Sequence, residues 1–85
     1  MYRLKFSNQA DKFLRKLPSH LSQRIKTKLL ELARNPYSDK LDIVKLRNRN
    51  GYRLRVGDWR VIYEIQQNVL VIVVLKIAPR GGAYQ

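Results

Sequence analysis

The chain has 85 residues, of which 45% are hydrophobic, and this suits a single globular domain over residues 1–85 with no room for a second core. It has no cysteine, so disulfides, zinc–thiolate sites and cysteine nucleophiles are excluded. Its 18 lysine and arginine residues outnumber 6 acidic residues and give a net charge of +12, which attracts polyanions such as nucleic acid, an acidic protein or an anionic membrane surface.

The sequence contains no segment typical of export or of membrane insertion. Residues 1–13 lack an apolar stretch followed by a cleavage signal. The longest apolar run, Val69–Leu75, is much shorter than the ~20 residues that a membrane-spanning helix needs. We therefore expect a cytoplasmic protein without membrane contact, whose charge attracts nucleic acid or an acidic protein.

The first part of the chain predicts a strand followed by a helical hairpin. Apolar and basic side chains alternate over residues 2–6, which is the period of a half-buried strand. Ser7 then fits the N-cap of a helix that ends at Pro18, with an apolar stripe at Ala10, Phe13, Leu14 and Leu17. Ser19 is expected to cap a second helix, which ends before Asn35-Pro36 and has its stripe at Leu21, Ile25, Leu29 and Leu32.

The remaining residues predict strands joined by short connectors. Residues 36–42 form a connector, Ile43–Leu46 a short strand, and residues 47–51 a basic loop. After a strong hairpin comes a last strand, Val69–Lys76, which is apolar on both faces and should lie inside the sheet. The tail, residues 78–85, is expected to be irregular. The order predicts an α+β fold in which a strand and two helices precede three or four antiparallel strands, with the helices on one face.

The hairpin fixes which side chains share a face of the sheet. A two-residue turn at Gly57-Asp58 joins strands over residues 52–56 and 59–65, so Arg55 faces Arg60. Alternation then places three arginines on the solvent face: Arg53, Arg55 and Arg60. The same alternation turns the apolar set toward the core: Tyr52, Leu54, Val56, Trp59, Val61 and Tyr63.

The arginine cluster predicts a site for an anion. Like charges directly opposite each other destabilise a sheet, and a sequence that breaks a local rule often does so for function. Guanidinium groups bind phosphate oxygens through two parallel hydrogen bonds and keep their proton near neutral pH. The alternative is an ordinary solvated face on which the long side chains splay apart.

The other polar candidates are explained more simply by structure. His20 is the single histidine and belongs to the start of the second helix, away from the arginines. Asp58 is expected to be a turn residue, and Glu64 to face solvent near a strand end. With one histidine and no clustered carboxylates, we expect neither a metal site nor another cofactor.

Three segments resemble the RelE/ParE toxin superfamily: Lys45-Leu46, GYRLRVGDWRVIYEI (residues 51–65) and LKIAPRGGAY (residues 75–84). The chain is most similar to RelE-like toxins with a Pro-Arg-Gly-x-Ala-Tyr tail, and the likeness extends over nearly all of it. The resemblance implies a RelE-like, microbial-ribonuclease-like fold and a type II toxin that inhibits translation. Such a messenger RNA interferase enters the ribosomal A site and promotes attack of a ribose 2′-hydroxyl on the adjacent phosphorus without metal. A cognate RelB-like antitoxin would hold it inactive in a hetero-oligomer.

The resemblance also implies a set of site residues: Arg53, Arg55, Arg60, Arg80 and Tyr84. Arg60 and Arg80 are expected to stabilise phosphate charge, while Tyr84 transfers a proton or stacks on a base. Binding and orientation of substrate are expected from Arg53 and Arg55, with further contacts from Lys45, Arg47 and Arg49. Family members often carry lysine where this chain has Arg53 and Arg55. Arginine cannot serve as a general base near neutral pH, so the identity of the base stays open.

Two other functions are compatible with the same residues. A ParE-like inhibitor of gyrase shares the fold but cuts no RNA, and the arginines together with Tyr84 argue against it. The second alternative is a non-catalytic domain that binds RNA or the ribosome, or a toxin relic. All of these functions predict basic surfaces, so charge does not separate them.

Overall fold

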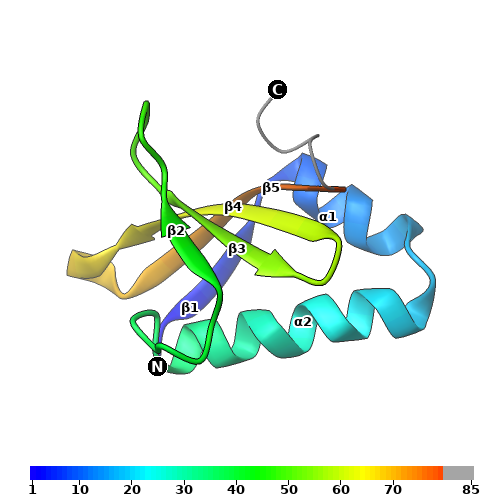
Figure 1. Ribbon diagram of the computed structural model, residues 1–85, viewed down its shortest axis with the longest axis horizontal. Coiled ribbons are helices and arrows are strands. Elements are labelled where there is room, and N and C mark those ends of the chain that lie inside the picture. Colours follow the sequence, from blue (N-terminus) through cyan, green and yellow to red (C-terminus); the bar gives the residue numbers. More distant parts are fainter. Residues whose placement is uncertain (80–85) are drawn as a thin grey trace.

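The computed structural model describes residues 1–79, which form two helices and one five-stranded sheet (Figure 1). The elements in chain order are β1 (Arg3–Phe6), α1 (Asn8–Lys16), α2 (Ser19–Arg34), β2 (Ile43–Lys45), β3 (Tyr52–Val56), β4 (Trp59–Gln66), a 3₁₀ turn (Gln67–Val69) and β5 (Val71–Pro79). The α+β class and the order of elements predicted from the sequence are confirmed. Most of the tail that the sequence predicts to be irregular, residues 80–85, lies outside the described residues.

The sheet has the strand order β1-β5-β4-β3-β2. β1 pairs in parallel with β5, with Arg3 opposite Val71, and the other pairs are antiparallel. The sequence predicts three or four antiparallel strands after the helices, and four are present. The sheet has a fifth strand because β1 joins it at one edge. β5 lies between β1 and β4, which confirms that its apolar residues place it inside the sheet.

The helix ends agree with the sequence at one cap and differ at the other. Ser7 is the N-cap of α1, and its hydroxyl accepts a hydrogen bond from the Ala10 amide at 3.1 Å. The prediction that Ser19 caps α2 is wrong, because the N-cap is Pro18 and no side chain caps this end. Pro18 already has the extended backbone of an N-cap (φ −52°, ψ 145°), so Ser19 becomes the first helical residue.

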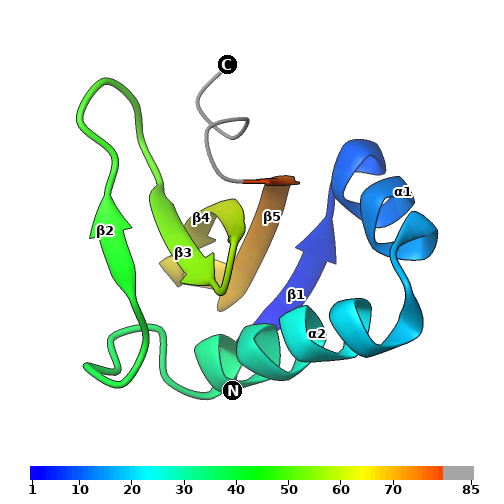
Figure 2. The same ribbon diagram turned by 45° about the vertical axis from the view of Figure 1, so that its right-hand side comes forward.

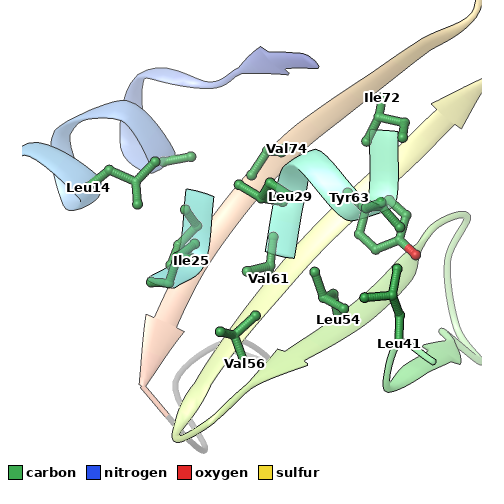
Figure 3. Close-up of a cluster of buried hydrophobic side chains, with 13 residues drawn as sticks. Leu14, Ile25, Leu29, Leu41, Leu54, Val56, Val61, Tyr63, Ile72 and Val74 are labelled. Atoms are coloured by element: carbon green, nitrogen blue, oxygen red, sulfur yellow. The ribbon is translucent and has the colours of Figure 1, made fainter. Parts of the chain in front are cut away.

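Both helices pack against one face of the sheet, and the main core lies between the helices and this face (Figure 3). The predicted apolar faces of the helices and of the hairpin meet there, and the cluster includes Leu14, Ile25, Leu29, Leu54, Val56, Val61, Tyr63, Ile72 and Val74. Trp59 packs edge-on against the Phe13 ring of α1, with 5.5 Å between ring centroids. Within residues 1–79 neither helix has the length and apolar content to cross a bilayer.

The last strand begins later than predicted and contains a β-bulge. Val69 and Leu70 are 54% and 50% exposed, because they lie in the turn before β5 and Leu70 adopts a left-handed φ of 54°. The pairing of β4 with β5 shifts so that Ile62 faces Lys76 and Tyr63 faces Val74, which leaves Leu75 as the extra residue. Leu75 and Lys76 consequently share the face of the sheet that points away from the helices.

Tyr63 carries a buried hydroxyl at the centre of the main core. Its ring is fully buried (Figure 3). It stacks on Tyr52 with 5.6 Å between ring centroids. The hydroxyl oxygen has no hydrogen-bond partner among residues 1–79. Burial, with smaller effects from Tyr52 and Tyr37, raises the pKa of Tyr63 far above its ordinary value of 10.0. The folded chain therefore keeps this proton at pH values where the unfolded chain releases it.

Tyr63→Phe should change how stability depends on alkaline pH. Above about pH 10 the folded wild type binds one more proton than the unfolded chain, so its free energy of unfolding should fall by ~1.4 kcal/mol per pH unit from this group. The variant should lack this decline and be at least as stable near neutral pH, because no hydroxyl is left without a partner. Urea unfolding at neutral pH and near pH 11 measures both effects, with Tyr52→Phe as control. A variant that is clearly less stable at neutral pH and declines like wild type would contradict this prediction.

Candidate functional site

The face of the sheet opposite the helices carries the predicted arginines. The hairpin register is the predicted one, with Arg55 opposite Arg60 and Arg53 opposite Ile62. On the other side of β4, Arg60 pairs with Ala78 and Ile62 pairs with Lys76. Four basic side chains from three neighbouring strands therefore share this outer face, and we call them the basic face: Arg53, Arg55, Arg60 and Lys76.

A small apolar cluster lies within the basic face. Ile62 and Ala78 are 1% and 6% exposed although they point away from the helices, and Leu46 and Leu75 pack against them. Long basic side chains can lay their carbon stems over such apolar surface and keep the charged ends outside it. The basic face is therefore an apolar floor bordered by cations, which is a drier surface than an ordinary solvated strand face.

Arg60 is the buried member of the basic face. Its exposed fraction is 8%, so the prediction that it lies on the solvent face is wrong. The alternation was correct, but the apolar floor next to Arg60 makes this part of the outer face a second buried cluster. Nε and Nη1 of Arg60 are buried and have no hydrogen-bond partner among residues 1–79. Burying a charged donor without a partner is costly, so these two donors mark a position where an anion would be stabilised.

Arg55 has a different environment from Arg60, although the two face each other across the strands. Arg55 is exposed, and its Nε donates a hydrogen bond to the Gly57 carbonyl oxygen at 3.2 Å. This bond ties the Arg55 side chain to the hairpin turn while Arg60 stays buried in the sheet. The sheet tolerates Arg55 opposite Arg60 because one side chain is exposed and the other is buried, so the two charged groups have different surroundings. Arg53 is intermediate in exposure.

Lys76 is the member of the basic face that the sequence analysis did not single out. It is half-buried and lies in the same cross-strand row as Ile62 and Arg53. Only the pairing of β5 with β4 turns it to the arginine side, and a strand that is apolar on both faces gives no local indication of that pairing. The signal that could have found it is its position as the one charged residue within an otherwise apolar strand.

The other sequence-predicted site residues do not join the basic face or cannot be placed. Lys45 pairs with Tyr52 and so lies on the other side of β2. It lines a polar hollow together with Glu64, which alternation along β4 places on the same face as Ile62. Arg47 and Arg49 are exposed in the loop between β2 and β3, which projects beyond the sheet (Figures 1 and 2). Arg80 and Tyr84 lie outside the described residues. His20 is exposed at the start of α2, as expected, whereas Glu64 is half-buried.

Two carboxylates form ion pairs on the helices. Asp11 pairs with Arg15 at 3.1 Å, and Glu31 pairs with Lys28 at 3.5 Å. Both pairs are solvent-exposed and contribute little to stability. They do not offset the charge of the sheet, because they belong to the opposite side of the molecule. Within residues 1–79 no three histidine, cysteine, aspartate or glutamate side chains gather as metal ligands do.

Comparison with known proteins relates the chain to toxins. Residues 4–84 match the family model described as ParE toxin of type II toxin-antitoxin system, parDE. The protein named toxin RelE1 of Methanocaldococcus jannaschii is 34% identical over 76 residues, which are 87% of this chain and 84% of the relative.

Solved structures give the same relationship at the level of the fold. The archaeal RelE–RelB complex of Pyrococcus horikoshii contains a chain with a TM-score of 0.80 and 36% identity, covering 95% of this chain and 97% of that one. A chain of the intact E. coli RelBE toxin–antitoxin complex has a TM-score of 0.77 and 29% identity, covering 93% of this chain and 96% of that one.

Inorganic phosphate should stabilise the folded protein through Arg60. A ligand that binds only the folded state raises the melting temperature by mass action, and Arg60 offers two donors that lack a partner within residues 1–79. Arg60→Met should be at least as stable as wild type without phosphate, because an apolar side chain replaces a buried charge. It should lose most of the increase that phosphate causes in wild type.

Thermal unfolding in phosphate and in sodium chloride of equal ionic strength measures this difference. Arg49→Met removes an equal charge from the exposed loop and should keep the wild-type response. Equal phosphate responses in all three proteins would show that Arg60 is not an anion site.

Proposed function

Since the chain belongs to the RelE/ParE family of toxins of type II toxin–antitoxin systems, we propose that it is a ribosome-dependent endoribonuclease that cuts messenger RNA. The observation that carries the proposal is the buried Arg60 guanidinium, whose Nε and Nη1 lack partners within residues 1–79, among further cations on the sheet face opposite the helices. A phosphodiester is an anion that suits this cation, because a guanidinium can bind two phosphate oxygens at once.

The proposed reaction needs charge stabilisation more than any other contribution. The ribose 2′-hydroxyl loses its proton as its oxygen attacks the adjacent phosphorus. The bond from phosphorus to the 5′-oxygen breaks, this oxygen takes up a proton, and a 2′,3′-cyclic phosphate and a 5′-hydroxyl remain. Negative charge grows on the non-bridging oxygens and on the leaving 5′-oxygen. Preorganised donors in a surface of low polarity stabilise that charge without reorganising, and Arg60 is preorganised by burial in the sheet.

The other site residues receive supporting roles in this proposal. Arg53 and Arg55 would bind and orient the backbone, while Arg80 and Tyr84, carried over from the family resemblance, would add charge and a proton-transferring or stacking group. Arg47 and Arg49 lie on the projecting loop and would contact phosphates farther along the RNA, as would Lys45 from the other side of β2. These contacts would contribute affinity and salt dependence rather than rate.

The ribosome would supply the positioning that the toxin lacks. Neither α1 nor α2 covers the basic face, because both pack on the opposite face of the sheet (Figure 2). Holding the 2′-hydroxyl in line with the scissile bond can contribute ~7–11 kcal/mol to catalysis, and the ribosome would provide most of this. We propose that residues 1–85 act as one toxin domain in the cytoplasm, with the ribosomal A site as scaffold. A RelB-like antitoxin would bind it in a hetero-oligomer.

Inhibition of gyrase is the second candidate, because the matching family model is that of the ParE toxins. A gyrase inhibitor needs no phosphate site, so it leaves the buried donors of Arg60 without an explanation. A supercoiling assay with purified gyrase separates the two functions. Inhibition of gyrase by a protein that leaves ribosome-bound messenger RNA intact would favour this candidate over the nuclease.

Single-turnover cleavage of messenger RNA on programmed ribosomes tests the proposal. Wild type should cut ribosome-bound RNA rapidly and naked RNA very slowly, and removal of one donor to the transition state should lower the rate by ~10²–10³. Arg60→Met should therefore lose cleavage but retain ribosome binding, whereas Arg49→Met should cut at nearly the wild-type rate. Cleavage by Arg60→Met at the wild-type rate, or equally fast cleavage of naked RNA, would contradict the proposal.

A further inference from the structure

Lys76 occupies a position on the basic face from which it can reach the same anion as Arg60. Arg60 pairs with Ala78, and Lys76 lies two residues before Ala78 on the same face of β5. Such diagonal neighbours on adjacent strands are ~7–8 Å apart, within the combined reach of two long side chains. Ile62 separates Lys76 from Arg53 in the same cross-strand row, because Ile62 pairs with Arg53 on one side and with Lys76 on the other.

The chemistry of Lys76 differs from that of the three arginines beside it. A lysine side chain is an ammonium with three protons at neutral pH and can release one of them, whereas a guanidinium keeps all of its protons. The proposed reaction needs such a group, because the leaving 5′-oxygen must take up a proton as its bond to phosphorus breaks. Among the four members of the basic face, Lys76 alone can supply it.

We infer that Lys76 is the general acid of the cleavage reaction, a role that rests on the proposed nuclease function. The 2′-hydroxyl loses its proton to water as its oxygen bonds to phosphorus, and Nζ of Lys76 transfers a proton to the 5′-oxygen as the bond from phosphorus to that oxygen breaks. The products are the 2′,3′-cyclic phosphate, a 5′-hydroxyl and a neutral amine that regains its proton from water. Arg60 holds the non-bridging oxygens during this step, so the two side chains act on different oxygens of one phosphate.

The apolar surroundings of Lys76 favour this role. Lys76 is half-buried beside the floor formed by Ile62 and Ala78 and follows the bulged Leu75. Ile62 and Ala78 exclude water from the floor of the basic face, and a proton transfer next to this floor competes less with solvent. Lys5, the other lysine that alternation turns to this face, is exposed on the edge strand β1 and lies one strand farther from Arg60.

A substrate with sulfur in place of the 5′-oxygen tests the assignment, because a thiolate leaves without a proton. On ordinary messenger RNA in programmed ribosomes, Lys76→Met and Lys76→Arg should both cut ~10²–10⁴-fold more slowly than wild type, the usual contribution of a general acid. On RNA with one 5′-phosphorothiolate at the cleavage site, both variants should cut within a few-fold of wild type. Arg60→Met should stay impaired on both substrates, and Lys5→Met should resemble wild type on both.

The outcomes separate this role from the function on which it rests. If Lys76→Arg cuts ordinary RNA like wild type, Lys76 contributes only charge and the assignment is wrong. If Lys76→Met is equally impaired on the sulfur substrate, the side chain acts on binding or folding and the assignment is also wrong. If wild type cuts neither substrate on ribosomes, the nuclease proposal itself fails, and this inference fails with it.

Discussion

The pairing of β3 with β4 through the Gly57-Asp58 turn is the constraint on which the candidate site depends. Gly57 has a φ of +60°, which a type II′ turn requires at its first central position and which glycine adopts without strain. The two-residue turn sets Arg55 opposite Arg60 and sends every second side chain of both strands into the core. A slip of one residue would turn the arginines inward and the core residues outward, so burial of Leu54, Val61 and Tyr63 protects the site geometry.

The basic face carries a cost in stability that the main core offsets. Arg60 is a buried cation with two donors that lack partners among residues 1–79. A second cation, Arg55, lies directly opposite it on the neighbouring strand. Either feature alone would be selected against in a sheet that served only as a scaffold. Their occurrence together, around an apolar floor, indicates a surface that becomes favourable when a polyanion binds. An acidic antitoxin or an RNA backbone would each supply the missing charge.

The parts of the fold that the sequence predicts are those that short-range patterns determine. The Ser7 cap, the apolar stripes of both helices and the hairpin register each depend on neighbours within a few residues. The parallel pairing of β1 with β5 joins residues 68 positions apart, such as Arg3 and Val71, and no local pattern specifies it. The bulge at Leu75 likewise exists only in relation to β4.

The same distinction explains what was and was not foreseen in the site. Alternation was enough to gather Arg53, Arg55 and Arg60 on one face, whereas the place of Arg60 between β3 and β5, opposite Arg55 and Ala78, depends on strand pairing. Lys76 was missed because its face is decided by pairing with β4 rather than by its own strand. Residues whose roles depend on long-range pairing are therefore the ones that a sequence pattern leaves unassigned.

The proposed function requires that Nε and Nη1 of Arg60, which lack partners within residues 1–79, are held in place for a phosphate of the RNA. Nuclear magnetic resonance of the arginine Nε–Hε groups during titration with a short RNA carrying 2′-deoxyribose at the cleavage position tests this most directly, since that RNA binds without being cut. The Arg60 signal should shift at lower RNA concentrations than that of the exposed Arg49, and Arg60→Met should weaken binding more than Arg49→Met. A response of the exposed arginines with an unchanged Arg60 signal would contradict the claim.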